Sequence, residues 1–115
     1  MENISYGQWI QDKLEELANQ TKTDGQIWRP SYSDHDRTGH ELPRTWITDA
    51  GLEWREDVIG NVYGRLSGVS TETILIGSHI DTVKNGGKYD GAAGVITGLA
   101  VLKFLKEQGV RPQYT

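Results

Sequence analysis

The order of secondary-structure elements along the sequence predicts an α/β fold in which helices pack on a mixed β-sheet. Three observations support this fold class. Two segments with helical periodicity come first, two short strand-like segments follow, and an apolar run then leads through a loop into a last helix. With 115 residues, 36% of them hydrophobic, the chain has enough apolar material for one compact unit with a core.

The first helix is predicted from a capping pattern and an apolar face. Ser5 and Gln8 are spaced for reciprocal capping of the first amide groups, and the helical pattern ends between residues 19 and 23. The apolar positions recur at helical spacing and are Trp9, Ile10, Leu14, Leu17 and Ala18. We therefore expect an amphipathic helix that buries one side.

A loop and a second helix are expected next. Residues 24–36 are rich in Gly, Pro, Ser and Asp, which is typical of a loop, and Trp28 and Tyr32 are its candidate anchors. The second helix is predicted from Asp36 to Ala50. Because a proline inside a helix removes a donor and clashes with the preceding turn, this helix either starts just before Pro43 or is kinked there.

Three strand candidates and a last helix complete the pattern. Residues 52–58 and 62–66 are expected to form a hairpin around a Gly-Asn pair. Residues 73–77 are apolar on both faces, which is typical of a central strand covered on both sides. The spacing of apolar residues predicts a helix over residues 92–109, and residues 110–115 are interpreted as a connector toward a next strand.

Composition limits the function classes that fit the chain. Twelve Lys and Arg against sixteen Asp and Glu give a formal charge of −4, without a basic block that could neutralise phosphates, so nucleic acid is not an expected partner. The first three residues lack the basic start of a leader peptide, and the longest uncharged stretch, Gly91–Leu102, is too short to span a bilayer. We expect a cytoplasmic chain without a membrane partner. Because cysteine is absent, any metal must be held by His, Asp or Glu.

A candidate metal site follows the apolar strand, where open α/β sheets place ligands. In an extended chain, His79 and Asp81 project to the same side. His79 can then serve as a metal ligand while Asp81 holds the second ring nitrogen. Asp90 falls at the start of the following helix, where it can cap the helix and where the helix dipole favours an ionised carboxylate that can bridge two cations. Two metals ~3.5–4 Å apart would activate water and polarise a carbonyl for hydrolysis.

Each of these features has a simpler interpretation. A His-x-Asp pair is often only hydrogen-bonded, Asp90 alone is a routine helix cap, and Gly86-Gly87 is a turn or an anion-binding nest. The ordered combination of strand, His-x-Asp, Gly-rich loop and Asp-Gly favours the metal site. His35 and His40 are expected to be solvated, and the four tryptophans are expected in the core or at interfaces.

The stretch GSHIDTV at Gly77–Val83, followed by NGGKYDGAAGV at Asn85–Val95, resembles the M20 metallopeptidase family. The resemblance is to its branch of N-carbamoyl-L-amino-acid hydrolases and allantoate amidohydrolases. It extends over Ser5–Gly109 and includes Gly25, Arg29, Ser33, Asp36, Ala50-Gly51-Leu52, Asp57 and Gly60-Asn61. It implies part of a three-layer αβα catalytic domain of the zinc-exopeptidase type.

The resemblance also implies roles for the site residues. His79 would bind one metal, Asp90 would bridge two metals, and Asp81 would be the catalytic residue that orients His79. The cofactor would be two divalent metal ions, zinc in the first place, with manganese, cobalt or nickel serving in relatives. Whether the 115-residue chain alone holds them is left open.

The activity implied is metal-dependent hydrolysis of a linear amide, the carbamoyl or ureido C–N bond of an N-carbamoyl-amino acid or an allantoate-like small molecule, by a homodimeric full-length enzyme. Members of this branch are several times longer and continue into a strand followed by a Glu-Glu pair. We therefore expect residues 1–115 to be the amino-terminal part of the catalytic domain, inactive when isolated.

Other interpretations remain open at this stage. One is an aminoacylase or peptidase of the same M20 type. Another is a non-catalytic remnant or a self-associating module, because a half-built sheet leaves strand edges that invite association. A phosphate or dinucleotide cradle in the Gly-rich loop is the weakest, since no G-x-G-x-x-G is present and neither Gly-Lys-Ser nor Gly-Lys-Thr follows the loop.

Overall fold

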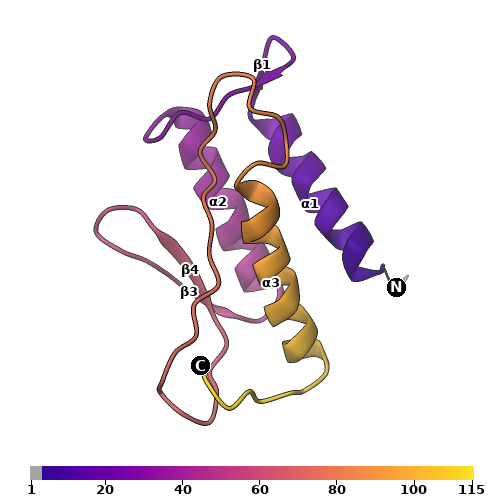
Figure 1. Ribbon diagram of the computed structural model, residues 1–115, viewed down its shortest axis with the longest axis vertical. Coiled ribbons are helices and arrows are strands. Elements are labelled where there is room, and N and C mark those ends of the chain that lie inside the picture. The colour runs from indigo at the N-terminus through magenta and orange to yellow at the C-terminus, as the bar shows by residue number, and fades with distance from the viewer. Residues whose placement is uncertain (1–3) are drawn as a thin grey trace.

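The computed structural model describes residues 4–115 as three helices, two short hairpins and a long extended segment (Figure 1). The expectation about the first three residues lies outside the described part. The elements are α1 Tyr6–Gln20, β1 Lys22–Thr23, β2 Gln26–Ile27, α2 Asp34–Asp49, β3 Glu53–Glu56, β4 Val62–Arg65 and α3 Ala92–Glu107. The mixture of helices and strands agrees with the predicted α/β class, although the two sheets described are small and antiparallel.

The core lies between the three helices, which run side by side (Figure 1). Leu17 of α1, Trp46 of α2 and Ile96 of α3 are almost fully buried and belong to one cluster. Burial of large side chains of this kind stabilises a fold by about 1.5–3 kcal/mol each. The predicted apolar faces of the first and last helices therefore form the core, as expected.

Of the reciprocal cap predicted for α1, only the bond to the Ser5 side chain is present. The Oγ atom of Ser5 accepts a hydrogen bond of 3.1 Å from the backbone N–H of Gln8. The side-chain amide of Gln8 does not return to Ser5, because it donates to Asp12 at 2.7 Å, one turn further along the helix. The helix ends at Gln20, within the predicted range.

Helix α2 begins earlier than predicted and continues through its proline. Ser33 caps it by accepting from the backbone N–H of Asp36 at 3.2 Å, so the alternative of a start just before Pro43 is wrong. Pro43 is buried on the same helix as Trp46 and Ile47. Packing of this face compensates for the hydrogen bond that the proline cannot make.

The loop before α2 is anchored by a different residue from those predicted. Trp28 is 42% exposed and Tyr32 is 84% exposed, so neither is an anchor. The loop instead contains the short β1–β2 hairpin, and Arg29 beside it is completely buried. Arginine is rarely buried unless it is paired, so the sequence offered little reason to place it there.

The predicted hairpin is confirmed, with β3 and β4 antiparallel in a register that places Glu53 opposite Arg65. Its connection is organised by Asp57, whose carboxylate accepts from the backbone N–H groups of Ile59 at 3.1 Å and Asn61 at 2.9 Å. The side-chain amide of Asn61 lowers the pKa of Asp57 most, and those two backbone groups and the Tyr63 hydroxyl add to the effect.

The expectation of a buried central strand over residues 73–77 is wrong for this structure. Ile74, Leu75 and Ile76 are 64%, 77% and 59% exposed, and residues 72–83 are assigned to no strand. Figure 1 shows this part of the chain running lengthwise past the helices. A strand covered on both sides needs sheet neighbours along its length, and within residues 4–115 the segment is paired only at its start, by Thr115.

The predicted connector at the end of the chain is hydrogen-bonded to the amino-terminal end of this extended segment. The N–H of Thr115 donates to the carbonyl of Glu72 and the N–H of Ile74 donates to the carbonyl of Thr115, both at 2.9 Å. Bonds from one residue to two residues on either side of Thr73 follow the pattern of a parallel ladder. Residues 110–115 thus lead to a position beside the extended segment.

Helix α3 is confirmed with its predicted end, since Gln108 caps it and Gly109 follows with a positive φ. The extended segment lies close to this helix. A Cβ atom on Gly94 would meet Ser78 at 2.8 Å, and one on Gly98 would meet Ile76 at 3.0 Å. Within residues 4–115, no helix is both long and apolar enough to cross a bilayer.

Candidate functional site

Alternating burial orients the residues at the end of the extended segment. Ile80 and Thr82 are 7% and 5% exposed and face the protein, so His79 and Asp81 face the opposite way. The methyl group of Ile80 lies where a side chain on α2 residue Gly39 would be, since a Cβ there would approach it to 2.5 Å. This close packing fixes the direction of the two candidate site residues.

The structure brings His79 and Asp81 together. Nδ1 of His79 lies 3.2 Å from Oδ1 of Asp81 and 3.0 Å from the backbone carbonyl oxygen of the same residue. Both neighbours only accept hydrogen bonds, so we assign the proton of the neutral ring to Nδ1. The lone pair of Nε2 is then available to a ligand on the opposite side of the ring.

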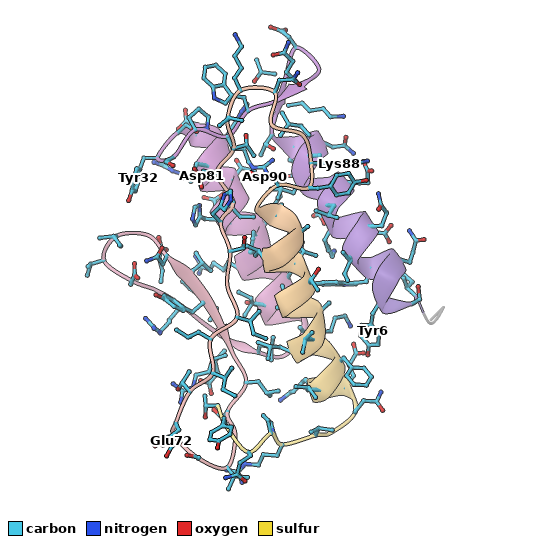
Figure 2. The ribbon with its side chains drawn as sticks, viewed as in Figure 1. Tyr6, Tyr32, Glu72, Asp81, Lys88 and Asp90 are labelled. Atoms are coloured by element: carbon cyan, nitrogen blue, oxygen red, sulfur yellow. The ribbon has the colours of Figure 1, made fainter. Side chains whose placement is uncertain are left out.

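Asp90 lies on that opposite side, at the start of α3. Its Oδ2 atom is 3.8 Å from Nε2 of His79, and Figure 2 places Asp90 and Asp81 at the same end of the helix. The predicted helix cap is wrong, because Gly91 is the N-cap residue and no side-chain cap bond is present at this end. The Asp90 carboxylate is 70% exposed and is not used by the helix.

The position of Asp90 depends on Gly91. Gly91 has φ +71° and ψ −56°, a conformation that L residues with a side chain rarely adopt. A Cβ atom at this position would lie 2.4 Å from the carbonyl oxygen of His79 and 2.5 Å from its ring carbon Cε1. Only glycine therefore lets the helix begin against the imidazole.

The pair His79 and Asp90 fits a shared divalent cation. Metal–nitrogen and metal–oxygen bonds of about 2.0–2.2 Å allow two ligand atoms of one ion to be at most ~4.3 Å apart. The separation of 3.8 Å lies within that limit. Among residues 4–115, however, no group of three or more His, Cys, Asp or Glu side chains could hold a metal. These residues supply two converging candidate ligand atoms, and a complete coordination shell would require others.

The loop before Asp90 is fixed to α1 by an ion pair. Nζ of Lys88 donates to Oε1 of Glu15, and Figure 2 shows Lys88 beside α1. This hydrogen bond is the main cause of a raised pKa for Lys88 and a lowered pKa for Glu15. The N–H of Gly86 is directed at the carbonyls of Ile27 and Val83, which supports a turn and argues against an anion-binding nest.

Two contacts to the site escaped sequence analysis. Oγ of Ser31 donates to Oδ2 of Asp81 at 3.0 Å, and Nε of Arg29 donates to the carbonyl of Ile80 at 2.9 Å. Partners separated by about fifty residues leave no local pattern, so only the resemblance drew attention to Arg29.

His35 and His40, the other two histidines, do not belong to the candidate ligand pair of His79 and Asp90. Both lie on α2 and are partly exposed, so the expectation that they are solvated is met only in part. Nδ1 of His35 lies 3.0 Å from the carbonyl of Trp28, and Nδ1 of His40 lies 2.8 Å from the carbonyl of Asp36. A cavity of about 710 Å³ is lined by His40, His79 and Asp81 and also by Ile74, Leu75 and Ile76 of the exposed segment.

Comparison with known proteins shows which enzymes this chain resembles. The chain is 43% identical to allantoate amidohydrolase from Bacillus subtilis (strain 168) over 99% of its own length and 28% of that protein. It is 39% identical to N-carbamoyl-L-amino-acid amidohydrolase from Pseudomonas sp. (strain NS671), over 84% of the chain and 24% of that protein. Its structure superposes with a TM-score of 0.83 on a hydantoinase/carbamoylase family amidase from Burkholderia ambifaria, at 35% identity, covering 92% of this chain and 26% of the other.

Over most of its own length, the chain resembles allantoate and N-carbamoyl-L-amino-acid amidohydrolases and hydantoinase/carbamoylase family amidases. The family model that matches, over residues 61–115, is described as peptidase family M28, a different label from the M20 resemblance. The relatives are nevertheless those of the predicted branch. The family is of the metal-dependent peptidase and amidohydrolase type, which supports a divalent metal in general terms. The chain spans about a quarter of the length of the relatives it matches, 24% to 28%.

Proposed function

We propose that this chain supplies half of the metal site of an enzyme that hydrolyses a linear amide, the carbamoyl or ureido C–N bond of an N-carbamoyl-amino acid or an allantoate-like small molecule. The observation that carries the proposal is the placement of His79 Nε2 and Asp90 Oδ2 3.8 Å apart, with Asp81 on the other ring nitrogen. The names of the relatives support the substrate class.

The residues present define what this half of the site does. His79 and Asp90 would hold the metal, and Asp90, with two exposed oxygens, would bridge a second ion. Asp81 would keep the Nδ1 proton in place, so that Nε2 presents its lone pair to the metal. When bound, a pair of divalent ions, zinc in the first place, supplies Lewis-acid chemistry at the scissile carbonyl and a water activated for attack.

The same proposal includes the setting of the site. Residues 1–115 would be the amino-terminal part of the catalytic domain of a cytoplasmic, homodimeric enzyme, and the isolated chain would be inactive. The number of converging ligands supports this, since two side chains rarely hold a catalytic dinuclear centre.

A chimera tests the proposed activity. In it, this chain replaces the segment that it matches in the Bacillus subtilis allantoate amidohydrolase. We expect the chimera to hydrolyse allantoate or an N-carbamoyl-amino acid, and we expect His79→Ala to abolish turnover. His35→Ala is the matched control, because this histidine is bonded to the Trp28 carbonyl away from Asp90. A folded chimera whose turnover survives His79→Ala would refute the proposal.

The isolated 115-residue chain provides the complementary experiment. It should hydrolyse neither allantoate nor N-carbamoyl-amino acids in the presence of Zn²⁺ or Mn²⁺. Turnover at an enzymatic rate, or two tightly bound metal ions per chain, would contradict the proposal that the site is incomplete.

The exposed apolar segment favours a second candidate, a self-associating module. Ile74, Leu75 and Ile76 are all more than half exposed and their backbone N–H groups are largely unpaired among residues 4–115. Unpaired extended segments with apolar side chains promote pairing between chains. Measuring molecular mass at several concentrations separates the two, because a monomer at every concentration would argue against self-association.

A further inference from the structure

We propose that Arg29 and Ser31, on the segment that follows β2, are positioning residues that hold the His79–Asp81 pair in its ligand-binding arrangement. The inference rests on the proposed function, because it gives these residues a role in the metal site. The side-chain hydrogen bonds of Arg29 and Ser31 go to Thr21, Ile80 and Asp81 and not to His79 or Asp90, so both residues act through Asp81 and its neighbours.

The backbone of Arg29 is bonded to the residue that follows Asp81. The N–H of Thr82 donates to the carbonyl of Arg29 at 2.8 Å, and the N–H of Arg29 donates to Oγ1 of Thr82 at 2.9 Å. Nε of Arg29 donates to the carbonyl of Ile80 at 2.9 Å. Three bonds therefore fix the residues on both sides of Asp81, while Asp81 itself remains directed at His79.

The Arg29 side chain ties this contact to the core. Its Nη1 atom donates to Oγ1 of Thr21 at 2.8 Å, and the Thr21 hydroxyl donates to the carbonyl of Leu17 at 2.7 Å. Arg29, Thr21 and Leu17 have almost no exposed surface. A continuous set of hydrogen bonds thus runs from the end of α1 to the backbone of Ile80.

The charge of Arg29 also faces the site. Burial lowers the pKa of Arg29 from its ordinary value, and the carboxylates of Asp36 and Asp81 oppose that shift. A guanidinium remains protonated in proteins, so a buried positive charge lies behind Asp81. The attraction between this charge and the Asp81 carboxylate helps to hold Asp81 beside His79.

Ser31 acts on the carboxylate directly. Its Oγ atom donates to Oδ2 of Asp81 at 3.0 Å, and Oδ1 of the same carboxylate faces Nδ1 of His79 at 3.2 Å. Each oxygen has one partner, so rotation of the carboxylate is opposed from both sides. Ser31 is exposed, which means that removing its hydroxyl should disturb the orientation of Asp81 more than the stability of the fold.

Three variants of the metal-free chain test the role of Ser31. Ser31→Ala removes the hydroxyl, Ser31→Thr restores it, and Ser67→Ala removes the hydroxyl of an exposed serine that lies elsewhere. The readout is the long-range ¹H–¹⁵N spectrum of the His79 ring in mildly alkaline buffer, which reports the nitrogen that carries the proton. We expect the Nδ1-protonated form in the parent, Ser31→Thr and Ser67→Ala, and a mixture of both forms in Ser31→Ala, with unchanged circular dichroism.

Titration with Mn²⁺, followed by relaxation broadening of the His79 signals, supplies the second readout. Removal of groups that orient a metal ligand commonly weakens metal binding by 10–100-fold, so we expect Ser31→Ala to weaken it by about 10-fold and Ser31→Thr to restore it. If Ser31→Ala matches the parent in both readouts, the proposal is overturned. If Ser31→Ala changes the His79 spectrum but the chimera with the Bacillus subtilis enzyme shows no turnover, the positioning role stands and the proposed function fails.

Arg29 needs a conservative comparison because it is buried. Arg29→Lys keeps the charge and one donor, whereas Arg29→Met keeps most of the volume and removes both. We expect Arg29→Met to lose the Nδ1-protonated form of His79 and Arg29→Lys to retain part of it. If Arg29→Met is folded and shows the parent spectrum, Arg29 has no positioning role. If Arg29→Met does not fold, Arg29→Lys is compared with the parent instead. An unchanged His79 spectrum in Arg29→Lys would mean that the positive charge alone positions Asp81, and it would overturn the role of the Nε hydrogen bond to Ile80.

Discussion

Replacing Gly91 by alanine should damage the site more than the same change at Gly87. Both glycines lie in the loop before α3 with positive φ, +71° and +76°. An L residue in a left-handed conformation costs about 1–2 kcal/mol, and we expect at least this cost at both positions, since ψ −56° places Gly91 outside even the left-handed region. A Cβ at Gly87 would meet nothing within 4 Å, whereas a Cβ at Gly91 would meet three atoms of His79 at 2.4–2.6 Å.

The magnitude follows from this difference. Forcing additional atoms into a packed site costs about 1–3 kcal/mol, so Gly91→Ala should destabilise the chain by about 2–5 kcal/mol in total and Gly87→Ala by only about 1–2 kcal/mol. The chain can relieve the clash by moving His79 away from Asp90. The 3.8 Å separation between the two ligands would then increase, and metal binding would weaken.

Urea unfolding followed by circular dichroism measures the first effect, and Mn²⁺ titration of the folded variants measures the second. Gly87→Ala should keep the Mn²⁺ affinity of the parent. Equal unfolding free energies for the two variants, within about 0.5 kcal/mol, together with equal Mn²⁺ affinities, would refute the assignment of Gly91 as the residue that places Asp90 beside His79.

Three further changes test other parts of the structure. Asp57→Asn should lower stability at neutral pH. Because folding lowers the pKa of Asp57, its carboxylate stabilises the fold above the ordinary Asp pKa, and this stabilisation is lost as pH falls through the folded-state pKa. The urea midpoints of parent and variant should therefore converge in acid. Lys88→Met and Glu15→Gln should each increase amide hydrogen exchange in the loop before α3, and the double variant should add little to either, because one ion pair is lost in all three cases. Leu75→Lys should suppress any concentration-dependent association measured by light scattering without changing the circular dichroism, since this side chain is 77% exposed.

Local interactions were the part of the fold that could be predicted from sequence. The cap of α1 at Ser5, the end of α3 near Gly109 and the β3–β4 hairpin depend on residues within a few positions of one another. The pairing of His79 with Asp81 is of the same kind, because an extended backbone alone brings both to one side.

Long-range interactions account for what could not be predicted. The burial of Arg29 depends on Thr21 and Ile80, the latter 51 positions away, and no pattern around Arg29 distinguishes it from a solvated arginine. The helix through Pro43 depends in the same way on the packing of its buried face. Apolar character on both faces of residues 73–77 describes a preference for burial, which is satisfied only when sheet neighbours are present.

The arrangement of the candidate ligands His79 and Asp90 therefore does not depend on whether the sheet is complete. Residues 80 and 82 are bonded to Arg29, which is fixed to α1 through Thr21, and Asp90 is placed by Gly91 at the start of α3. None of these contacts involves Ile74, Leu75 or Ile76, the exposed part of the extended segment. The segment from Arg29 to Ser31, the extended residues around Ile80 and the start of α3 thus hold the candidate half-site together. For this reason a change at Leu75 should alter association but leave the His79 spectrum intact, and a change at Ser31 should do the reverse.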